Sequence, residues 1–287
     1  MAGETSPDVT KPKRYPPVGR CIYCGRTEGL TDEHIVPLAL NGAWILPKST
    51  CPRCSKITAQ IETAALHKTY LGYRIQKDFR TRRRKQRNAK RIKVTRRSEG
   101  KTEVFYDDFK NAPVFLMHMR LQPPTILTNK EPPKGHSAMS MLIATDIRHF
   151  VTTQKLASGE FISEYNHKSV ARMLAKIAHA YACAELGLGR FNPLLPGLIL
   201  GEVEWVYNYL VGGDYVVNAP HTPLPKLPLM HSLHLTSEKA GSGKRFYVAK
   251  IRLFAYEDSP VYTIIVGQKT GFIATCRYWL SFKRAST

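Results

Sequence analysis

Residues 21–54 read CIYCGRTEGLTDEHIVPLALNGAWILPKSTCPRC, and this stretch decides the fold of the N-terminal part of the chain. It opens with Cys21 and Cys24 and closes with Cys51 and Cys54, two CxxC pairs that enclose 26 residues. Each pair places two thiolates on one tight turn, and two such turns complete a tetrahedral set of sulfur ligands. The spacing therefore predicts a structural Zn²⁺ site. A redox-active pair is the alternative for either turn taken alone.

An acid and a histidine stand between the cysteine pairs, where Glu33 and His34 are followed by two apolar residues and Pro37. An imidazole with a pKa near neutrality is a suitable general base for phosphodiester hydrolysis, and a divalent ion held by a carboxylate can neutralise the phosphate. His34 alone would more often be a surface or core residue, and Glu33 alone a solvated acid. Their order between two cysteine pairs is what favours a catalytic interpretation.

The pattern CxxC…EHxxP…G…CxxC, from Cys21 to Glu62, resembles the HNH endonuclease family. The resemblance implies a ββα-metal core, in which a β-hairpin carries the histidine and a helix begins at or just after the second cysteine pair. It implies His34 as the general base and Glu33 as a ligand of a catalytic divalent cation, Mg²⁺ or a transition metal. It also makes Asn41 a candidate for the asparagine that orients the histidine.

The chain departs from the family pattern directly after the last cysteine. Ser55 stands where the family usually has an asparagine or histidine as a second ligand of the catalytic ion, and serine is a weak metal ligand. Glu62 lies seven residues further along the same helix face and reaches the site only if the ion lies further along the helix. The second protein ligand therefore stays open. The main alternative function is a catalytically degenerate, zinc-dependent nucleic-acid-binding protein.

The charge balance of the chain indicates a polyanionic partner. Its 287 residues include 43 Lys and Arg against 22 Asp and Glu, a formal net charge of +21, and nucleic acid is the commonest polyanion. Basic residues are densest in residues 71–100, and little aromatic interleaving favours contact with the DNA backbone over stacking on single strands. RNA stays an alternative substrate, and a solvated linker is the alternative for the segment. The phosphate-binding candidates are Arg74, Arg80, Arg82, Arg83, Arg84, Lys85 and Arg87.

The expected fold class is α+β. Residues 1–19 are expected to be a flexible tail, 20–70 the zinc-stabilised HNH module, 71–100 a basic segment and 101–287 a separate α+β domain of unassigned role. Within that last region, helical spacing predicts a helix over 169–188 that ends at glycine. Strand-like segments lie at 112–119, 138–145, 202–210, 214–218, 245–254 and 261–266, and the glycines of 241–243 indicate a turn.

Several further features receive no function. Lys176 and His179 are expected to face solvent or a partner, His231 to be structural, and Cys183 and Cys276 to be small buried residues. No segment is apolar enough to span a membrane, and no signal-peptide pattern is visible, so a cytoplasmic protein with reduced cysteines is expected. Whether cleavage cuts one strand or both depends on two copies acting together, which leaves a homodimer open.

Overall fold

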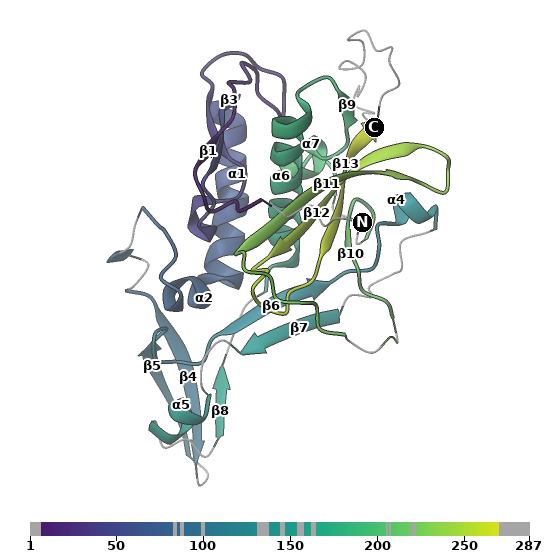
Figure 1. Ribbon diagram of the computed structural model, residues 1–287. Helices are drawn as coiled ribbons and strands as arrows, with labels where there is room; N and C mark the ends of the chain where they lie inside the picture. Colours follow the sequence, from purple (N-terminus) through teal and green to yellow (C-terminus); the bar gives the residue numbers. More distant parts are fainter. Residues whose placement is uncertain are drawn as a thin grey trace, which may run out of the picture.

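The computed structural model describes residues 7–82, 85–86, 89–98, 101–130, 138–143, 147–153, 158–161, 165–204, 206, 208–217, 219 and 222–269. Helices and sheets are mixed along this part of the chain, as expected for the α+β class (Figure 1). Three of the predicted phosphate-binding arginines, Arg83, Arg84 and Arg87, lie outside the described residues, and so does Cys276.

The strands are β1 (Lys13–Arg14), β2 (Thr31–His34), β3 (Trp44–Thr50), β4 (Arg91–Ser98), β5 (Lys101–Asp108), β6 (Phe115–Arg120), β7 (Ala138–Ile143), β8 (Ser158–Phe161), β9 (Phe191–Pro193), β10 (Val211–Gly213), β11 (His231–Lys239), β12 (Arg245–Leu253) and β13 (Tyr262–Lys269). The helical segments are η1 (Leu38–Leu40), α1 (Pro52–Ala64), η2 (Ala65–Thr69), α2 (Leu71–Gln76), α4 (Thr125–Thr128), α5 (Ile147–Thr153), α6 (His167–Leu186) and α7 (Pro196–Leu200).

The segment between the cysteine pairs folds as a hairpin followed by a helix. β2 pairs antiparallel with β3, so that Glu33 lies opposite Leu46 and His34 opposite Ile45. α1 begins at Pro52, directly after the second strand. Proline is favoured in the first turn of a helix because its φ is already helical and its missing N–H would have no partner there. The histidine strand and the helix are therefore neighbours along one short stretch of chain.

The loop that joins β2 to β3 requires glycine at position 42. η1 ends at Asn41, which has a left-handed backbone with φ 62°. A Cβ atom on Gly42 would lie 2.1 Å from the carbonyl oxygen of Val36, far inside the contact distance of two such atoms. The close approach of these two backbone segments turns the chain back toward β3.

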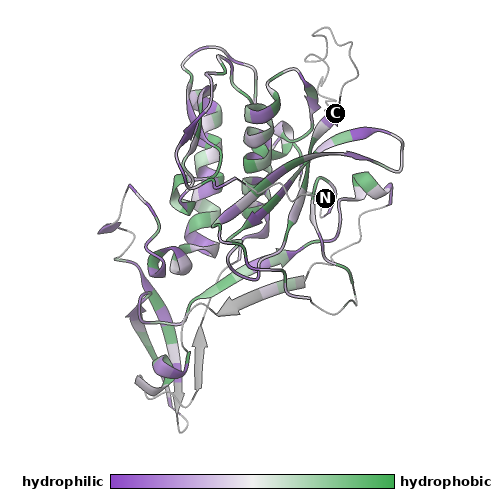
Figure 2. Ribbon diagram, viewed as in Figure 1, coloured by the Kyte–Doolittle hydropathy of each residue, from purple (hydrophilic) through white to green (hydrophobic). Residues whose placement is uncertain are grey.

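Helix α6 is the centre of the molecule. It packs against α1 on one side and against β12 and β13 on the other (Figure 1). Those two strands belong to a five-stranded sheet of order β10-β13-β12-β11, with β9 pairing with β13. Figure 2 shows β6 as mostly hydrophobic and α6 as a mixture of hydrophobic and hydrophilic residues. Asn166 caps α6 by accepting a hydrogen bond from the backbone N–H of Ser169 at 2.9 Å, and Gly187 follows its last residue.

One hydrophobic core joins the two ends of the described chain. It runs from Val9 through the cysteine pairs and α6 to Val266. The sequence prediction of a flexible tail over residues 1–19 is wrong for residues 7–19: Val9 is fully buried, and β1 pairs parallel with β3. The boundary expected near residues 71–100 does not separate two cores, because α1 packs directly on α6.

Part of the basic segment forms a sheet. β4 pairs antiparallel with β5 and with β8, and the apolar side chains of Ile92 and Val94 pack against Phe150 of α5. This three-stranded sheet and α5 extend away from the central helices (Figure 1). The alternation of basic and apolar residues in β4 explains how so charged a segment forms a strand: one face is buried and the other meets solvent.

Most predicted elements of the C-terminal region are confirmed, including the long helix, the strands near 115, 140, 250 and 264, and the turn at 241–243. The strands predicted at 202–210 and 214–218 are wrong. The described residues of these stretches are turns and irregular backbone, and the strand lies between them as β10. Residues of the two stretches such as Val203, Val216 and Val217 are exposed, so their β-branched side chains have no apolar layer to pack on.

Candidate metal centre and catalytic pocket

The four cysteines of the two CxxC pairs meet at one point. Their Sγ atoms all lie within 4.8 Å of one another, and those of Cys24 and Cys51 are 3.5 Å apart. Sulfurs bound to one zinc ion at about 2.3 Å stand about 3.8 Å from each other, so the cluster fits a tetrahedral ion. Cys21, Cys51 and Cys54 are buried and Cys24 is half-buried, as in a closed structural site. The predicted four-cysteine cluster, which could hold a structural metal ion, is confirmed.

Local backbone geometry places both pairs. In the first pair, the N–H of Gly25 donates to the carbonyl oxygen of Cys21 at 2.9 Å, and Gly25 has a φ of 78°, which L side chains rarely adopt. In the second pair, Cys51 is the residue before α1 and Cys54 lies in its first turn. Each pair of thiols is therefore positioned by local structure, the first by a turn and the second by the start of a helix.

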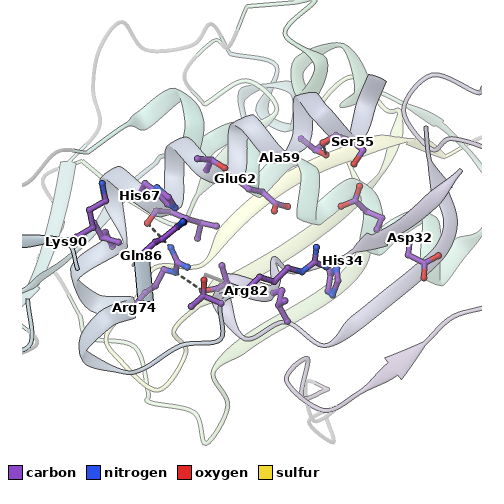
Figure 3. Close-up of a pocket in the computed structure, with 18 of the residues that line it drawn as sticks. Asp32, His34, Ser55, Ala59, Glu62, His67, Arg74, Arg82, Gln86 and Lys90 are labelled. Atoms are coloured by element: carbon purple, nitrogen blue, oxygen red, sulfur yellow. Dashed lines mark hydrogen bonds between the residues drawn. The ribbon is translucent and has the colours of Figure 1, made fainter. Parts of the chain in front are cut away.

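An open cavity of about 1010 Å³ lies beside this centre. It is lined by the end of β2, by one face of α1 with η2, and by the basic segment near residues 81–90 (Figure 3). The side chains that can take part in chemistry or bind phosphate include His34, Ser55, Glu62, His67, Arg82 and Lys90.

His34 lies half-buried at the end of β2 and reaches this cavity (Figure 3). Burial lowers the pKa of His34, and the charge of Lys176 lowers it further; Arg82 adds to the effect, while Glu33 opposes it. The imidazole is therefore neutral at physiological pH, and a neutral imidazole has a lone pair that can accept a proton from water.

Glu33 is enclosed by hydrogen-bond donors. One of its carboxylate oxygens is 2.7 Å from Nζ of Lys176. The other accepts from Oγ1 of Thr50 at 2.8 Å and from the hydroxyl of Tyr23 at 3.3 Å. The side chain of Glu33 is only 9% exposed. Glu33 also lines the cavity, so these three donors hold its carboxylate at the cavity wall.

Lys176 of α6 joins the hairpin to α1. Its ammonium group is 2.9 Å from a carboxylate oxygen of Glu62 and also donates to the backbone carbonyl of His34. The prediction that Lys176 faces solvent or a partner is wrong, since its side chain is completely buried. Burial by itself lowers the pKa of Lys176, but Glu33 and Glu62 together raise it above its ordinary value, so the group is charged.

The resemblance implied Glu33 as a ligand of a catalytic divalent cation, and this arrangement does not fit that role. Both oxygens of Glu33 already accept hydrogen bonds, and the position between Glu33 and Glu62 is filled by the ammonium group of Lys176. Ser55 lines the cavity, but a serine hydroxyl is a weak ligand. The position between Glu33 and Glu62 therefore holds the ammonium group of Lys176 and not a metal ion.

Asn41 is not brought to His34. Its side-chain oxygen accepts a hydrogen bond from the backbone N–H of Arg80 at 2.8 Å, and its amide nitrogen lies 3.6 Å from the sulfur of Met230. It does not line the cavity. The structure corrects the prediction that Asn41 orients the histidine: it fixes the basic segment to the loop after η1 instead.

The predicted phosphate-binding residues divide into two groups. Arg80, Arg82 and Lys85 are exposed, and Arg82 lies at the cavity beside His34 (Figure 3). Arg74 is only 2% exposed, and its guanidinium donates to the backbone carbonyls of Ala39 and Leu66 at 2.8 and 3.2 Å. Arg74 lies in α2 and lines the cavity, but its guanidinium is engaged by these two carbonyls; that it binds phosphate stays a prediction.

Sequence reasoning missed two residues at the site and underrated a third. Lys176 gave no signal, because it is more than a hundred residues from the motif and lies in a helix of mixed composition. His67 also lines the cavity: it follows Thr63 by four residues, so the cavity-lining face of α1 continues into η2. Glu62 does reach the pocket, two turns beyond Ser55 on the same face of α1, as helical periodicity allowed.

Two buried histidines of the C-terminal half form hydrogen bonds with the backbone of the segment that contains the cysteine pairs. A ring nitrogen of His179 is 2.8 Å from the carbonyl oxygen of Ile22, and one of His231 is 2.7 Å from that of Leu40. The prediction that His179 faces solvent or a partner is wrong, since its side chain is buried within the chain, and the prediction that His231 is structural is confirmed. Cys183 is buried, as expected.

Among the helices in the described part of the chain, none combines the length and the apolar character that crossing a membrane requires. Comparison with protein-family models, with curated proteins and with solved structures found nothing that matches this chain.

Proposed function

We propose that this chain is an endonuclease that hydrolyses the phosphodiester bonds of DNA, with an HNH-type ββα-metal module and His34 as the general base. The observation that carries the proposal is the position of a neutral, half-buried His34 in an open cavity that it shares with Arg82 and Lys90. The order of hairpin, four-cysteine cluster and helix supports it, since the resemblance of residues 21–62 implies that order.

The proposed chemistry needs a base and positive charge. A water molecule in the cavity gives a proton to the ring of His34 and attacks the phosphorus, and the leaving oxygen takes up the electron pair. The guanidinium of Arg82 can bind two phosphate oxygens at once through paired N–H donors. The expected catalytic cation would have to displace Lys176 from between Glu33 and Glu62. We therefore assign no step to a metal ion.

The nucleic acid is expected to run from the cavity along the exposed basic residues. Lys85 and Lys90 follow Arg82, and the exposed side chains of Arg91 and Lys93 continue onto β4. Each phosphate neutralised releases counterions, so binding is expected to weaken steeply with salt. Replacement of Arg82 by alanine should reduce the slope of log K against log salt by about 1, without lowering thermal stability.

Plasmid cleavage tests the proposal. The zinc-loaded protein is incubated with supercoiled plasmid in Mg²⁺, Mn²⁺, Ni²⁺ or EDTA, beside His34→Ala and the control His234→Ala, whose histidine does not line the cavity. Loss of a general base is expected to slow cleavage by about 10²- to 10⁴-fold. Equal cleavage by His34→Ala and wild type would contradict the assignment of the base.

Ser55 supports a second candidate, a non-catalytic nucleic-acid-binding protein. It predicts salt-sensitive DNA binding that survives His34→Ala and no cleavage in any metal. A structured RNA incubated beside the plasmid distinguishes the third possibility, an RNA-cleaving enzyme. If only the RNA is cut, and His34→Ala does not cut it, the assignment of His34 as the base would stand and the substrate would be RNA instead of DNA.

A further inference from the structure

The ammonium group of Lys176 is surrounded by oxygens from three separate segments. They are a carboxylate oxygen of Glu33 in β2 at 2.7 Å, a carboxylate oxygen of Glu62 in α1 at 2.9 Å, and the backbone carbonyl oxygen of His34. Two carboxylates and a carbonyl are also the donor set that a hard divalent cation prefers. A position built for a cation is thus occupied by a side chain of the same polypeptide.

The ammonium group of Lys176 cannot leave this position without losing its partners. The lysine lies in the middle of a 20-residue helix whose neighbours Ala175 and Ile177 are fully buried, and its own side chain is completely buried. An ammonium group displaced from its two carboxylates would remain in the core without a partner, which is strongly unfavourable. A divalent ion beside the retained lysine would place three positive charges against two carboxylates, at distances where repulsion in a protein interior is large.

We propose that Lys176 is the resident cation of the Glu33–Glu62 pair and excludes divalent metal ions from it, so that removing this side chain creates a metal site between the two carboxylates. The lysine acts as a positioning residue: it holds Glu33, Glu62 and the backbone of His34 in fixed relation at the edge of the cavity. The proposal concerns the site of the proposed nuclease, but its test does not depend on cleavage.

The test is Mn²⁺ binding to the zinc-loaded, full-length protein, followed by electron paramagnetic resonance. Lys176→Ala, which frees both carboxylates and opens space, is expected to bind one Mn²⁺ ion at this position. Wild type is expected to bind Mn²⁺ there at least about 100-fold more weakly. The matched control is the double variant Lys176→Ala with Glu62→Gln, which keeps the space and loses a carboxylate. It is expected to lose the new site.

Two results would overturn the proposal. One is Mn²⁺ bound by wild type and lost in Glu62→Gln, which would mean that the metal displaces the lysine. The other is a folded, zinc-loaded Lys176→Ala that binds no Mn²⁺. If Lys176→Ala does not fold, Lys176→Gln replaces it, since a neutral amide keeps a donor near the carboxylates, and the wild-type titration decides the first point in any case. Absence of cleavage with every metal would count against the nuclease and leave the Mn²⁺ result intact.

Discussion

Replacing Cys54 by serine is expected to remove the metal ion from the four-cysteine cluster and to destabilise the protein as a whole. Cys54 is completely buried and lies in the first turn of α1, and the Sγ atoms of the four cysteines lie within 4.8 Å of one another. A serine hydroxyl is not a thiolate, so only three strong ligands would remain. The cluster belongs to the core that also includes α6, so the loss of stability is not confined to the two cysteine pairs.

The size of the effect follows from the thermodynamics of such sites. Structural zinc contributes about 10–16 kcal/mol of apparent binding free energy in small zinc-folded domains, whereas a whole protein is stable by only about 5–15 kcal/mol. If a quarter of the zinc term, about 3 kcal/mol, is lost as stability of the whole chain, Tm falls by about 6–12 °C at about 2–4 °C per kcal/mol.

Thermal unfolding and zinc content per chain measure this effect. The matched control is Cys183→Ser, a buried cysteine of α6 whose sulfur lies 3.7 Å from a ring nitrogen of His179 and outside the cluster. It is expected to keep one zinc ion and to lose about 1 kcal/mol at most. A Cys54→Ser protein that retains one zinc ion and melts with the control would refute the assignment of these four thiols as one metal centre.

Two further predictions concern stability. Burial lowers the pKa of His118 to about 3 and that of His231 to about 4. Only the unfolded chain takes up these protons, so stability is lost as pH falls from about 6.5 toward 4. His118→Phe should reduce the slope of the free energy of unfolding against pH, measured by denaturant unfolding, by about 1.4 kcal/mol per pH unit. An unchanged slope would contradict this. Gly42→Ala places a Cβ 2.1 Å from the Val36 carbonyl and should cost about 1–3 kcal/mol in denaturant unfolding, whereas Gly241→Ala, with its nearest atom 3.6 Å away, should be near neutral.

The sequence predicted the parts of the site that are close together along the chain. The four-cysteine cluster follows from the spacing of the two CxxC pairs, whereas the strand that ends at His34 and the helix that begins at Pro52 are what the resemblance of residues 21–62 implies. The long helix at 167–186 followed from its apolar period, and its end from the glycine at position 187; the cap at Asn166, which sets its start, was not predicted.

The sequence did not predict the contacts that the second half of the chain makes with the N-terminal hairpin and α1. A lysine and a histidine within a helix usually face solvent, and composition alone could not indicate that Lys176 and His179 are buried against the hairpin. Their partners are the carboxylates of Glu33 and Glu62 and the backbone carbonyls of His34 and Ile22, which lie more than a hundred residues away. Such pairs are fixed by tertiary packing, which no local pattern records.

The same packing predicts that the cysteine module cannot fold alone. Trp44 and Tyr23 are buried against α6, with ring centroids 6.0 Å from Tyr181 and 5.6 Å from His179. A fragment of residues 1–82 would expose both, at roughly 1.5–3 kcal/mol each, and would leave Glu33 without its lysine in a chain too short to compensate.

The fragment is expected to bind zinc, since all four cysteines are present, but to unfold without a cooperative transition in calorimetry and to show poorly dispersed amide resonances. The full-length protein, purified in the same way, is the control. A cooperative transition of the zinc-loaded fragment within a few degrees of the full-length protein would mean that α6 is dispensable. In that case the burial of Lys176 would be a consequence of docking between two independent domains, and the carboxylate pair would be free to hold another cation whenever they separate.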